Sequence, residues 1–380
     1  MVTREEDIAW IALGRLPGMN GPRCLAASDG CGSARQALAA SPRAWAAALG
    51  ELGGPAALPA PVDLDWAAEQ WERLQRSGGR LLTLADVEYP VLLRQIAQPP
   101  AVLFVLGPLD LNRPCVAIVG PRRASHYGVT VARRLAREVA EAGICVVSGL
   151  AAGVDSAAHR GALDVAGSTV AVLGCGADVP YPACHAQLHA ELCARGAVIS
   201  EFPMGSRPER GSFPRRNRLI SGLSLGVVLV ETPPRSGALI TARWAQEQGR
   251  EVLVVPGSVL DGRSEGGHRM VCDENAELVT CAADVLRQLG HWSSPPRPVA
   301  GPPDPEQAGA ATPAGGSARG RLSPEGRRVF GLLGGQPLHA DQISGLLQMP
   351  PSDLHGALLE LELEGLVAQL PGGRFVRVSP

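Results

Sequence analysis

The stretch CVAIVGPRRASHYGVTVARRLAREVAEAGICVVSG, residues 115–149, decides the fold class. Two continuous apolar runs, at residues 115–120 and 144–149, flank an amphipathic stretch of helix length at residues 128–143. Continuous rather than alternating apolar runs are typical of strands in a parallel sheet that helices cover on both faces. The stretch therefore predicts a strand–helix–strand unit with a right-handed crossover.

The same alternation continues along the chain to residue 257. Further apolar, β-branched runs lie at residues 168–174, 197–200, 225–231 and 251–257. Amphipathic stretches of helix length lie at residues 154–167, 185–196 and 237–249. Strands that alternate with helices predict a Rossmann-like, doubly wound α/β sheet, which we assign to a domain spanning residues 79–290.

The flanking regions predict three further parts. Residues 1–78 contain short helical stretches, and the turn LPGMNG at 16–21 is typical of a helix-hairpin-helix, although a plain Gly/Pro connector explains it equally. We expect a small helical domain of the SAM or helix-hairpin-helix type there.

Residues 291–320 are rich in Pro, Gly and Ala, which predicts a flexible linker. Residues 321–380 predict three helices and a hairpin, a winged helix-turn-helix, whose acidic third helix at 352–364 favours protein contact over DNA.

The composition excludes several classes of protein. Hydrophobic residues make up 45% of the 380 residues and charged residues 19%, which excludes global disorder. The net charge is −2, so any nucleic-acid site must be a local basic patch. All 35 basic residues are arginine, which excludes a Schiff-base lysine and a P-loop lysine.

The cysteines and the apolar runs indicate a compartment. The nine cysteines form no CxxC pair, and several lie in apolar runs, as is typical of buried thiols in a reducing environment. The start MVTREED is charged, and no apolar run reaches the ~18 residues that a membrane span needs. We therefore expect a cytoplasmic protein without a membrane partner.

The sequence contains no recognisable catalytic set. It has no GxSxG elbow, no HExxH helix, no Walker A loop and no zinc-ligand spacing. His185 and His189 are four residues apart but have no further ligand near them in the sequence. Glu201 and Glu231 lie at the ends of predicted strands and are candidates for general acid–base catalysis, but no activated nucleophile accompanies them. We therefore expect no catalytic residues, no metal and no cofactor.

The loops that follow the strands carry the candidate binding residues, because ligands of open parallel sheets bind at the carboxyl ends of the strands. The segment 205–222, expected to be a loop, contains five arginines and one glutamate, a local charge of +4. Guanidinium groups for the backbone and an aromatic ring for a base are typical of single-stranded nucleic-acid sites. The candidate DNA-binding residues are Gly120, Arg122, Arg123, Ser148, Gly149, Phe213, Arg215, Arg216, Asn217, Arg218, Ser236 and Gly237.

Several motifs together resemble one known family. VAIVGPRRAS (116–125), VVSGLAAGVDSAAHRGAL (146–163), FPRRNRLISGLS (213–224) and RSGALITA (235–242) are similar to those of the DNA processing protein A family, also called Smf. The resemblance implies a single-stranded DNA-binding protein that protects incoming strands during natural transformation and helps to load RecA. It also implies a homodimer formed through the Rossmann-like domain, with the strand in a positive pocket lined by the counterparts of Arg122 and of 213–218.

Members of the family often carry lysines near YP and SGLA, where this chain has Ala183, Cys184 and Ala152. The chain departs from the family pattern at two further places. Pro121 replaces a serine and removes one backbone donor, and residues 266–271 differ from the usual loop after PGS. The second departure bears on the dimer edge and the RecA contact rather than on the DNA pocket. The DNA hypothesis requires Arg122 to lie close to 213–218, without a carboxylate that lines the space between them.

Two alternative functions stay open at this point. Glycine-rich loops on such a sheet also resemble phosphoribohydrolases and related nucleotide-binding enzymes, but the turn RSGALIT at 235–241 gives an incomplete signature. An adaptor protein that acts through its winged helix is the third hypothesis. Release of a free base from a nucleoside monophosphate favours the enzyme, and DNA binding that survives deletion of residues 1–290 favours the adaptor.

Overall fold

The computed structural model separates the chain into two compact units, Met1–Arg297 and Pro298–Pro380. The predicted linker at 291–320 lies outside the described residues. The structure describes residues 3–53, 62–260, 262–274, 276–290, 323–333, 338–347, 349–363, 366–370 and 374–377.

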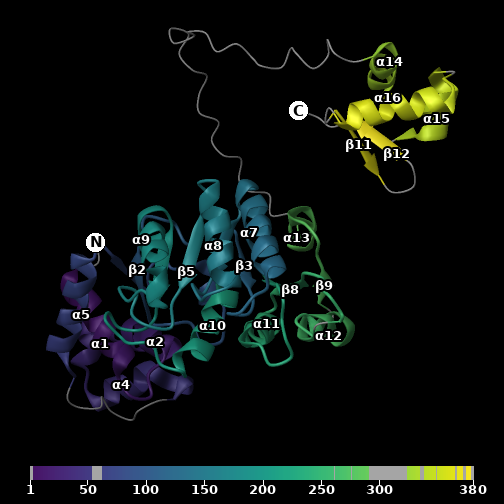
Figure 1. Ribbon diagram of the computed structural model, residues 1–380. Helices are drawn as coiled ribbons and strands as arrows, with labels where there is room; N and C mark the ends of the chain where they lie inside the picture. Colours follow the sequence, from purple (N-terminus) through teal and green to yellow (C-terminus); the bar gives the residue numbers. More distant parts are fainter. Residues whose placement is uncertain are drawn as a thin grey trace, which may run out of the picture. The chain divides into compact units, whose positions relative to one another are not determined.

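A nine-stranded sheet forms the centre of the first unit (Figure 1). Its strand order is β1-β2-β6-β5-β4-β3-β7-β8-β9. The neighbours from β6 to β9 pair in parallel, whereas β1 and β2 add an antiparallel edge beside β6. The strands are β1 (Arg80–Thr83), β2 (Val102–Leu106), β3 (Cys115–Val119), β4 (Cys145–Ser148), β5 (Thr169–Val172), β6 (Ala197–Ser200), β7 (Gly226–Leu229), β8 (Glu251–Val254) and β9 (Glu277–Leu278).

Helices cover both faces of this sheet, which confirms the doubly wound α/β fold. Val116 and Ile118 of β3 pack with α7, α8 and α13 on one face. Ala117 and Val119 point to the other face and pack in a core that contains α9, α10, α11 and the N-terminal helices. The helices are α7 (His126–Glu141), α8 (Val154–Asp164), η2 (Ala183–His185), α9 (Ala186–Arg195), α10 (Ser212–Gly222), α11 (Gly237–Glu247), α12 (Glu265–Asp273) and α13 (Ala282–Gln288).

The strand order places a crevice beside β3. From β3 the chain proceeds to β4, β5 and β6 on one side, and then returns to pair β7 with the other side of β3. Such a reversal separates the loops that follow β3 and β7, because their helices pack on opposite faces. The carboxyl ends of these two strands are therefore the expected position of a ligand site.

The N-terminal region is helical, as the sequence predicts, and its core is continuous with that of the sheet. Trp10, Leu13, Trp45 and Leu74 are buried in the same hydrophobic cluster as β2 and β6. Thr3, Asn20, Ser33, Ser41 and Asp63 begin these helices and accept a backbone N–H from the first turn. The helices are α1 (Arg4–Arg15), α2 (Gly21–Cys31), α3 (Ala34–Leu38), α4 (Pro42–Leu49), η1 (Gly50–Leu52), α5 (Leu64–Arg76) and α6 (Val91–Arg94).

The second unit has the three helices and the β-hairpin that the sequence predicts, so the winged helix is confirmed. Its antiparallel sheet has the order β10-β12-β11. Val329, Ile343, Leu361 and Phe375 lie in its separate core. The elements are α14 (Pro324–Leu332), β10 (Leu338–His339), α15 (Ala340–Leu347), α16 (Pro351–Leu363), β11 (Val367–Leu370) and β12 (Arg374–Arg377). Among the described residues, no helix has both the length and the apolar character of a membrane span.

Candidate nucleic-acid interface

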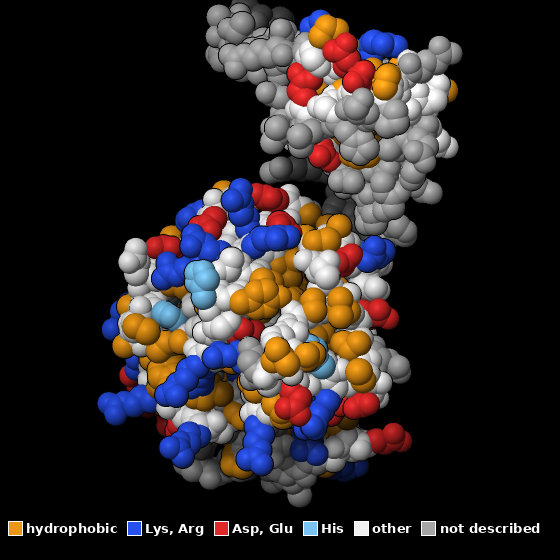
Figure 2. All heavy atoms as spheres, turned by 45° about the vertical axis from the view of Figure 1, so that its right-hand side comes forward, with side chains coloured by type: hydrophobic (Ala, Val, Ile, Leu, Met, Phe, Trp, Pro, Cys, Tyr) orange, Lys and Arg blue, Asp and Glu red, His pale blue; other side chains and the backbone are white. Residues whose placement is uncertain are grey.

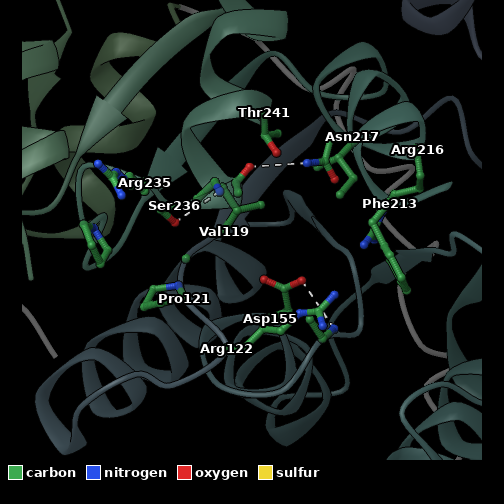
Figure 3. Close-up of a pocket in the computed structure, with 16 residues that line it drawn as sticks. Val119, Pro121, Arg122, Asp155, Phe213, Arg216, Asn217, Arg235, Ser236 and Thr241 are labelled. Carbon is green, nitrogen blue, oxygen red and sulfur yellow. Dashed lines mark hydrogen bonds between the residues drawn. The ribbon is translucent and has the colours of Figure 1, made fainter. Parts of the chain in front are cut away.

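A cleft of about 390 Å³ lies at the carboxyl edge of the sheet, where the strand order reverses. We call it the main cleft. The loops after β3 and β7 and one face of α10 surround it, as Figure 3 shows. Seven of the twelve predicted residues line it, namely Gly120, Arg122, Phe213, Arg216, Asn217, Ser236 and Gly237.

An arginine and an aromatic ring meet at this cleft. The guanidinium carbon of Arg122 lies 5.0 Å from the centroid of the Phe213 ring, within the range of a cation–π contact. The Phe213 ring lies in turn 5.5 Å from that of Tyr181, with an angle of 35° between the planes. These three side chains border an adjoining pocket of about 140 Å³, and Gly149 lies in its wall. Arg122 is therefore close to the 213–218 segment, as the DNA hypothesis requires.

Arg216 lies in the buried bottom of the main cleft, which we call its floor, rather than at the solvent-exposed edge, which we call its rim. Its side chain is buried, donates to the Val172 carbonyl oxygen, and leaves its Nε without a partner among the described atoms. A side chain on Gly149 would overlap the guanidinium group, so glycine is required there for close packing. Burial lowers the pKa of Arg216, and the nearby Asp155 carboxylate opposes that shift.

Asp155 brings a carboxylate into the main cleft. Its Oδ2 accepts the backbone N–H groups of Gly149 (3.2 Å) and Ala151 (3.3 Å). Burial raises the pKa of Asp155, and the neighbouring Arg216 and these backbone donors oppose that shift. The expectation that no carboxylate lines this region is wrong, because a buried guanidinium needs a counter-charge in a low-dielectric interior. Arg122 contacts Phe213 directly, and Asp155 neutralises the floor rather than the rim.

The basic segment contains a helix where a loop was expected, which corrects the sequence prediction. Helix α10 begins at Ser212, and helical spacing sorts its side chains onto two faces. Phe213, Arg216 and Asn217 face the main cleft, whereas Arg215 and Arg218 line a different cleft of about 460 Å³. The structure therefore does not bring Arg215 and Arg218 together with Arg122.

Arg215 and Arg218 share one buried carboxylate. Arg218 makes two bonds to Glu201, of 3.0 and 2.7 Å, and both side chains are less than a tenth exposed. The Nε of Arg215 lies 3.1 Å from the same carboxylate, although the Arg215 side chain is 61% exposed. Glu201 is thus held in ion pairs and is not free to act as an acid or base.

The remaining predicted residues have supporting or peripheral positions. Ser148 is buried and its hydroxyl donates to the Ile118 carbonyl oxygen at 2.7 Å. Arg123 is exposed next to Arg122 but does not line the main cleft. Glu231 accepts both the backbone N–H and the hydroxyl of Ser125.

Sequence reasoning missed Arg235 and Thr241 as cleft residues. Both line the main cleft, and both belong to the same RSGALIT turn and helix start that supplied Ser236 and Gly237. Arg235 is exposed, so the loop after β7 carries a cation opposite the one after β3 (Figure 3). On the face that Figure 2 draws, basic side chains are interspersed with apolar and acidic ones.

The candidate metal ligands among the described residues are engaged elsewhere or apart from one another. Within the described ranges, no group of three or more His, Cys, Asp or Glu side chains is placed to hold a metal ion. His185 bonds to the Leu150 carbonyl oxygen at 3.0 Å, and His189 to that of Ala177 at 2.8 Å. Each of these two histidines is thus engaged with backbone rather than with a shared ligand.

Comparison with known proteins gives the same identification as the motifs. The model of the DNA recombination-mediator protein A family matches residues 80–290, and that of the DprA winged helix domain matches residues 295–373. The chain is 38% identical to protein Smf of Synechocystis, covering 80% of this chain and 82% of that protein. It is 40% identical to protein Smf of Escherichia coli, covering 77% of this chain and 76% of that protein.

Two solved structures are similar as well. The X-ray structure of DNA processing protein A from Streptococcus pneumoniae matches with a TM-score of 0.63 and 33% identity, over 76% of this chain and 99% of that one. A Helicobacter pylori DNA processing protein A, whose structure is described as giving insights into its single-stranded DNA binding mode, matches with a TM-score of 0.50 and 30% identity, over 56% of this chain and 97% of that one. The chain therefore belongs to the DNA recombination-mediator protein A family, the DprA/Smf proteins.

Proposed function

We propose that this protein binds single-stranded DNA in the main cleft and acts as a mediator of recombination on incoming strands. The observation that carries this proposal is the Arg122 guanidinium group over the Phe213 ring, in a cleft at the point where the strand order reverses. The single-stranded DNA binding described for the Helicobacter pylori relative supports the same assignment.

The aromatic side of the cleft favours unpaired bases. Phe213 and Tyr181 are tilted toward each other beside a pocket of about 140 Å³. Every base has a flat face that stacks on an aromatic ring, but in duplex DNA that face is covered by the neighbouring base pair. A side chain on Gly174 would lie 3.1 Å from the Phe213 ring. Glycine at this position therefore allows the ring to pack where it does without crowding.

The polar side of the cleft suits the phosphate backbone. Arg122, Arg123 and Arg235 are exposed cations on the two loops that flank the cleft. Ser236 and Gly237 begin helix α11, whose first backbone N–H groups carry partial positive charge. Gly120 has to be glycine because a side chain there would overlap Val154 and the Val230 carbonyl group, which would push the two loops apart. We therefore assign Arg122, Arg123, Phe213, Asn217, Arg235, Ser236 and Gly237 to DNA contact, and Ser148, Gly149 and Arg216 to the support of that surface.

A binding assay with single-stranded and duplex DNA tests this function. We expect the protein to retain a labelled oligothymidine much better than a duplex of equal length. Arg122→Ala should weaken binding by about 1–2 kcal/mol, because it removes a charge-assisted phosphate contact. Arg134→Ala is the matched control, since Arg134 is exposed on α7 and paired with Glu138. Equal retention of duplex and single strand, or wild-type binding by Arg122→Ala, would contradict the assignment.

We also propose that the protein forms a homodimer and helps to load RecA onto the bound strand. Strand β9 ends the sheet, and an unpaired edge strand is a template for pairing with a second copy. Leu278 on this strand is about half exposed, and Val259 and Leu260, in the loop between β8 and α12, are 82% and 93% exposed. Light scattering of Leu278→Arg and of the wild type tests whether the β9 edge forms the dimer. A RecA strand-exchange assay with Arg122→Ala tests the loading role.

A cytoplasmic location accords with the nine cysteines, none of which forms a disulfide.

A further inference from the structure

The 460 Å³ cleft lined by Arg215 and Arg218 has no role in the function proposed so far. We propose that it is a second site for single-stranded DNA, which holds the continuation of a strand that leaves the main cleft. We call it the second cleft. This inference rests on the proposed function and gives the N-terminal helical region a part in it.

The two clefts share their walls. Helix α10 sends Phe213 and Asn217 to the main cleft and Arg215 and Arg218 to the second. Helix α11 contributes Thr241 to the main cleft and Trp244, three residues further on, to the second cleft. The Asn217 amide donates to the Gly237 carbonyl oxygen at 3.3 Å and links the two helices. Because both helices contribute to both clefts, we infer that a strand bound in the main cleft can continue across these helices into the second.

The second cleft has a surplus of positive charge. Two guanidinium groups and one carboxylate, that of Glu201, line it, and its other wall residues are uncharged. Arg218 already bonds to both oxygens of Glu201, at 3.0 and 2.7 Å. Arg215 approaches the same carboxylate from the solvent side, and its guanidinium group lies 5.3 Å from the Phe202 ring centroid. Arg215 is therefore the cation that a phosphate group can reach.

The second cleft also offers a stacking surface. Trp244 is half-buried and lines it together with the amide side chains of Gln98 and Asn20. The second cleft thus contains an aromatic side chain and an exposed arginine, Arg215, as the main cleft contains Phe213 and Arg122. Asparagine and glutamine amides provide donors and acceptors for base edges.

The N-terminal turn closes the second cleft. Met19, Asn20 and Gly21 of the LPGMNG turn line it. A side chain on Gly21 would overlap the Pro99 carbonyl group, so glycine allows the start of α2 to pack tightly on this segment. Pro22 has no N–H, and the Arg23 N–H is already bonded to the Asn20 side chain at 3.1 Å. The turn thus acts as a wall, and Arg215 rather than the turn's backbone provides the phosphate contact.

The length of the bound strand tests this inference. We compare a short oligothymidine of about 6 nucleotides, which fills only the main cleft, with a long one of about 20 nucleotides. Trp244→Ala and Arg215→Gln should each weaken binding of the long strand by about 5- to 10-fold and leave the short strand unaffected. Trp244→Phe, which keeps an aromatic face, should restore most of the affinity. Arg243→Gln, an exposed neighbour on α11 that does not line the cleft, is the matched control.

The outcomes separate this inference from the proposed function. Ultraviolet cross-linking of the long strand to the peptide that contains Trp244 would support it independently of any effect on folding. Wild-type affinity of both variants for the long strand, or equal losses for both lengths, would overturn the second site while Arg122→Ala still weakens both strands. Wild-type affinity of Arg122→Ala for both strands would overturn the proposed function itself.

Discussion

The floor and the rim of the main cleft both use arginine, but in opposite ways. On the rim, Arg122 and Arg235 line the cleft and are exposed on loops. On the floor, Arg216 is buried against Gly149 and beside Asp155. A buried cation with a counter-charge holds the structure together, whereas an exposed cation is available to a polyanion. This difference shows that the number of arginines in a segment does not give the number of DNA contacts, because some of them are buried for structural reasons.

Removal of the floor arginine should give the largest effect. Arg216→Ala removes a buried donor to the Val172 carbonyl oxygen and the cation near the buried Asp155 carboxylate, and we expect the free energy of unfolding to fall by about 3–5 kcal/mol. Urea unfolding followed by tryptophan fluorescence measures this loss. Arg122→Ala on the rim should unfold at the wild-type midpoint. Equal stability of the two variants would remove the distinction between floor and rim.

A second effect concerns His159, which is buried behind the floor. Burial, the nearby Arg216 and His185 lower the pKa of His159 to about 3. Its Nδ1 bonds to Thr169 Oγ1 at 2.7 Å, and Thr169 Oγ1 donates to the Val146 carbonyl oxygen, so Nδ1 carries the proton of a neutral ring. Because the folded-state pKa lies below the ordinary value of 6.5, only the unfolded state takes up a proton as the pH falls from 6.5 toward 3. Stability should therefore be complete above pH 6.5 and fall by about 2 kcal/mol between pH 7 and pH 5.

Unfolding curves of the wild type and His159→Gln across this pH range measure that contribution. We expect the variant to lose stability less steeply with falling pH, whatever its stability at pH 7. Rim variants such as Arg122→Ala should keep the wild-type slope, because the rim contains no group that titrates there. Parallel slopes for the wild type and His159→Gln would show that the histidine is not held neutral by the fold.

The smallest effect should come from the contact between Arg122 and Phe213. A double-mutant cycle with Arg122→Ala and Phe213→Ala, read out as the affinity for a short oligothymidine, isolates this pair. The two losses should be non-additive by about 0.5–1 kcal/mol, the size of an exposed cation–π contact. Strict additivity would mean that the two side chains act on the strand independently of each other.

The sequence predicted the sheet well because buried parallel strands are continuous apolar runs with clear ends. The run at 197–200 coincides with β6, and the other predicted runs each contain one strand. The carboxyl-end rule likewise placed the cleft, and the wing hairpin followed from the pattern of the last 60 residues. The antiparallel addition of β2 to β6 was not predicted, because pairing between distant strands leaves no local signal.

The site was predicted less completely, for a reason of helical phase. Gly, Pro and Arg in the segment 205–222 favour a loop, and nothing in their order shows that Ser212 begins a helix. Once the helix forms, its period separates Arg215 and Arg218 from Phe213 and Arg216. The pairing of Glu201 with Arg218 bridges 17 residues of sequence and depends on the packed sheet. Such contacts need the tertiary structure and cannot be derived from spacing alone.

The salt dependence of single-strand binding tests the central claim most directly. Each phosphate contact on a single strand contributes about 0.7 to the slope of log affinity against log salt. If the rim arginines hold the strand, the double variant Arg122→Gln, Arg235→Gln should lower that slope by about 1.4 while Arg134→Gln leaves it unchanged. An unchanged slope in the double variant, with its fold intact, would contradict the claim that exposed arginines at this edge of the sheet bind the DNA backbone.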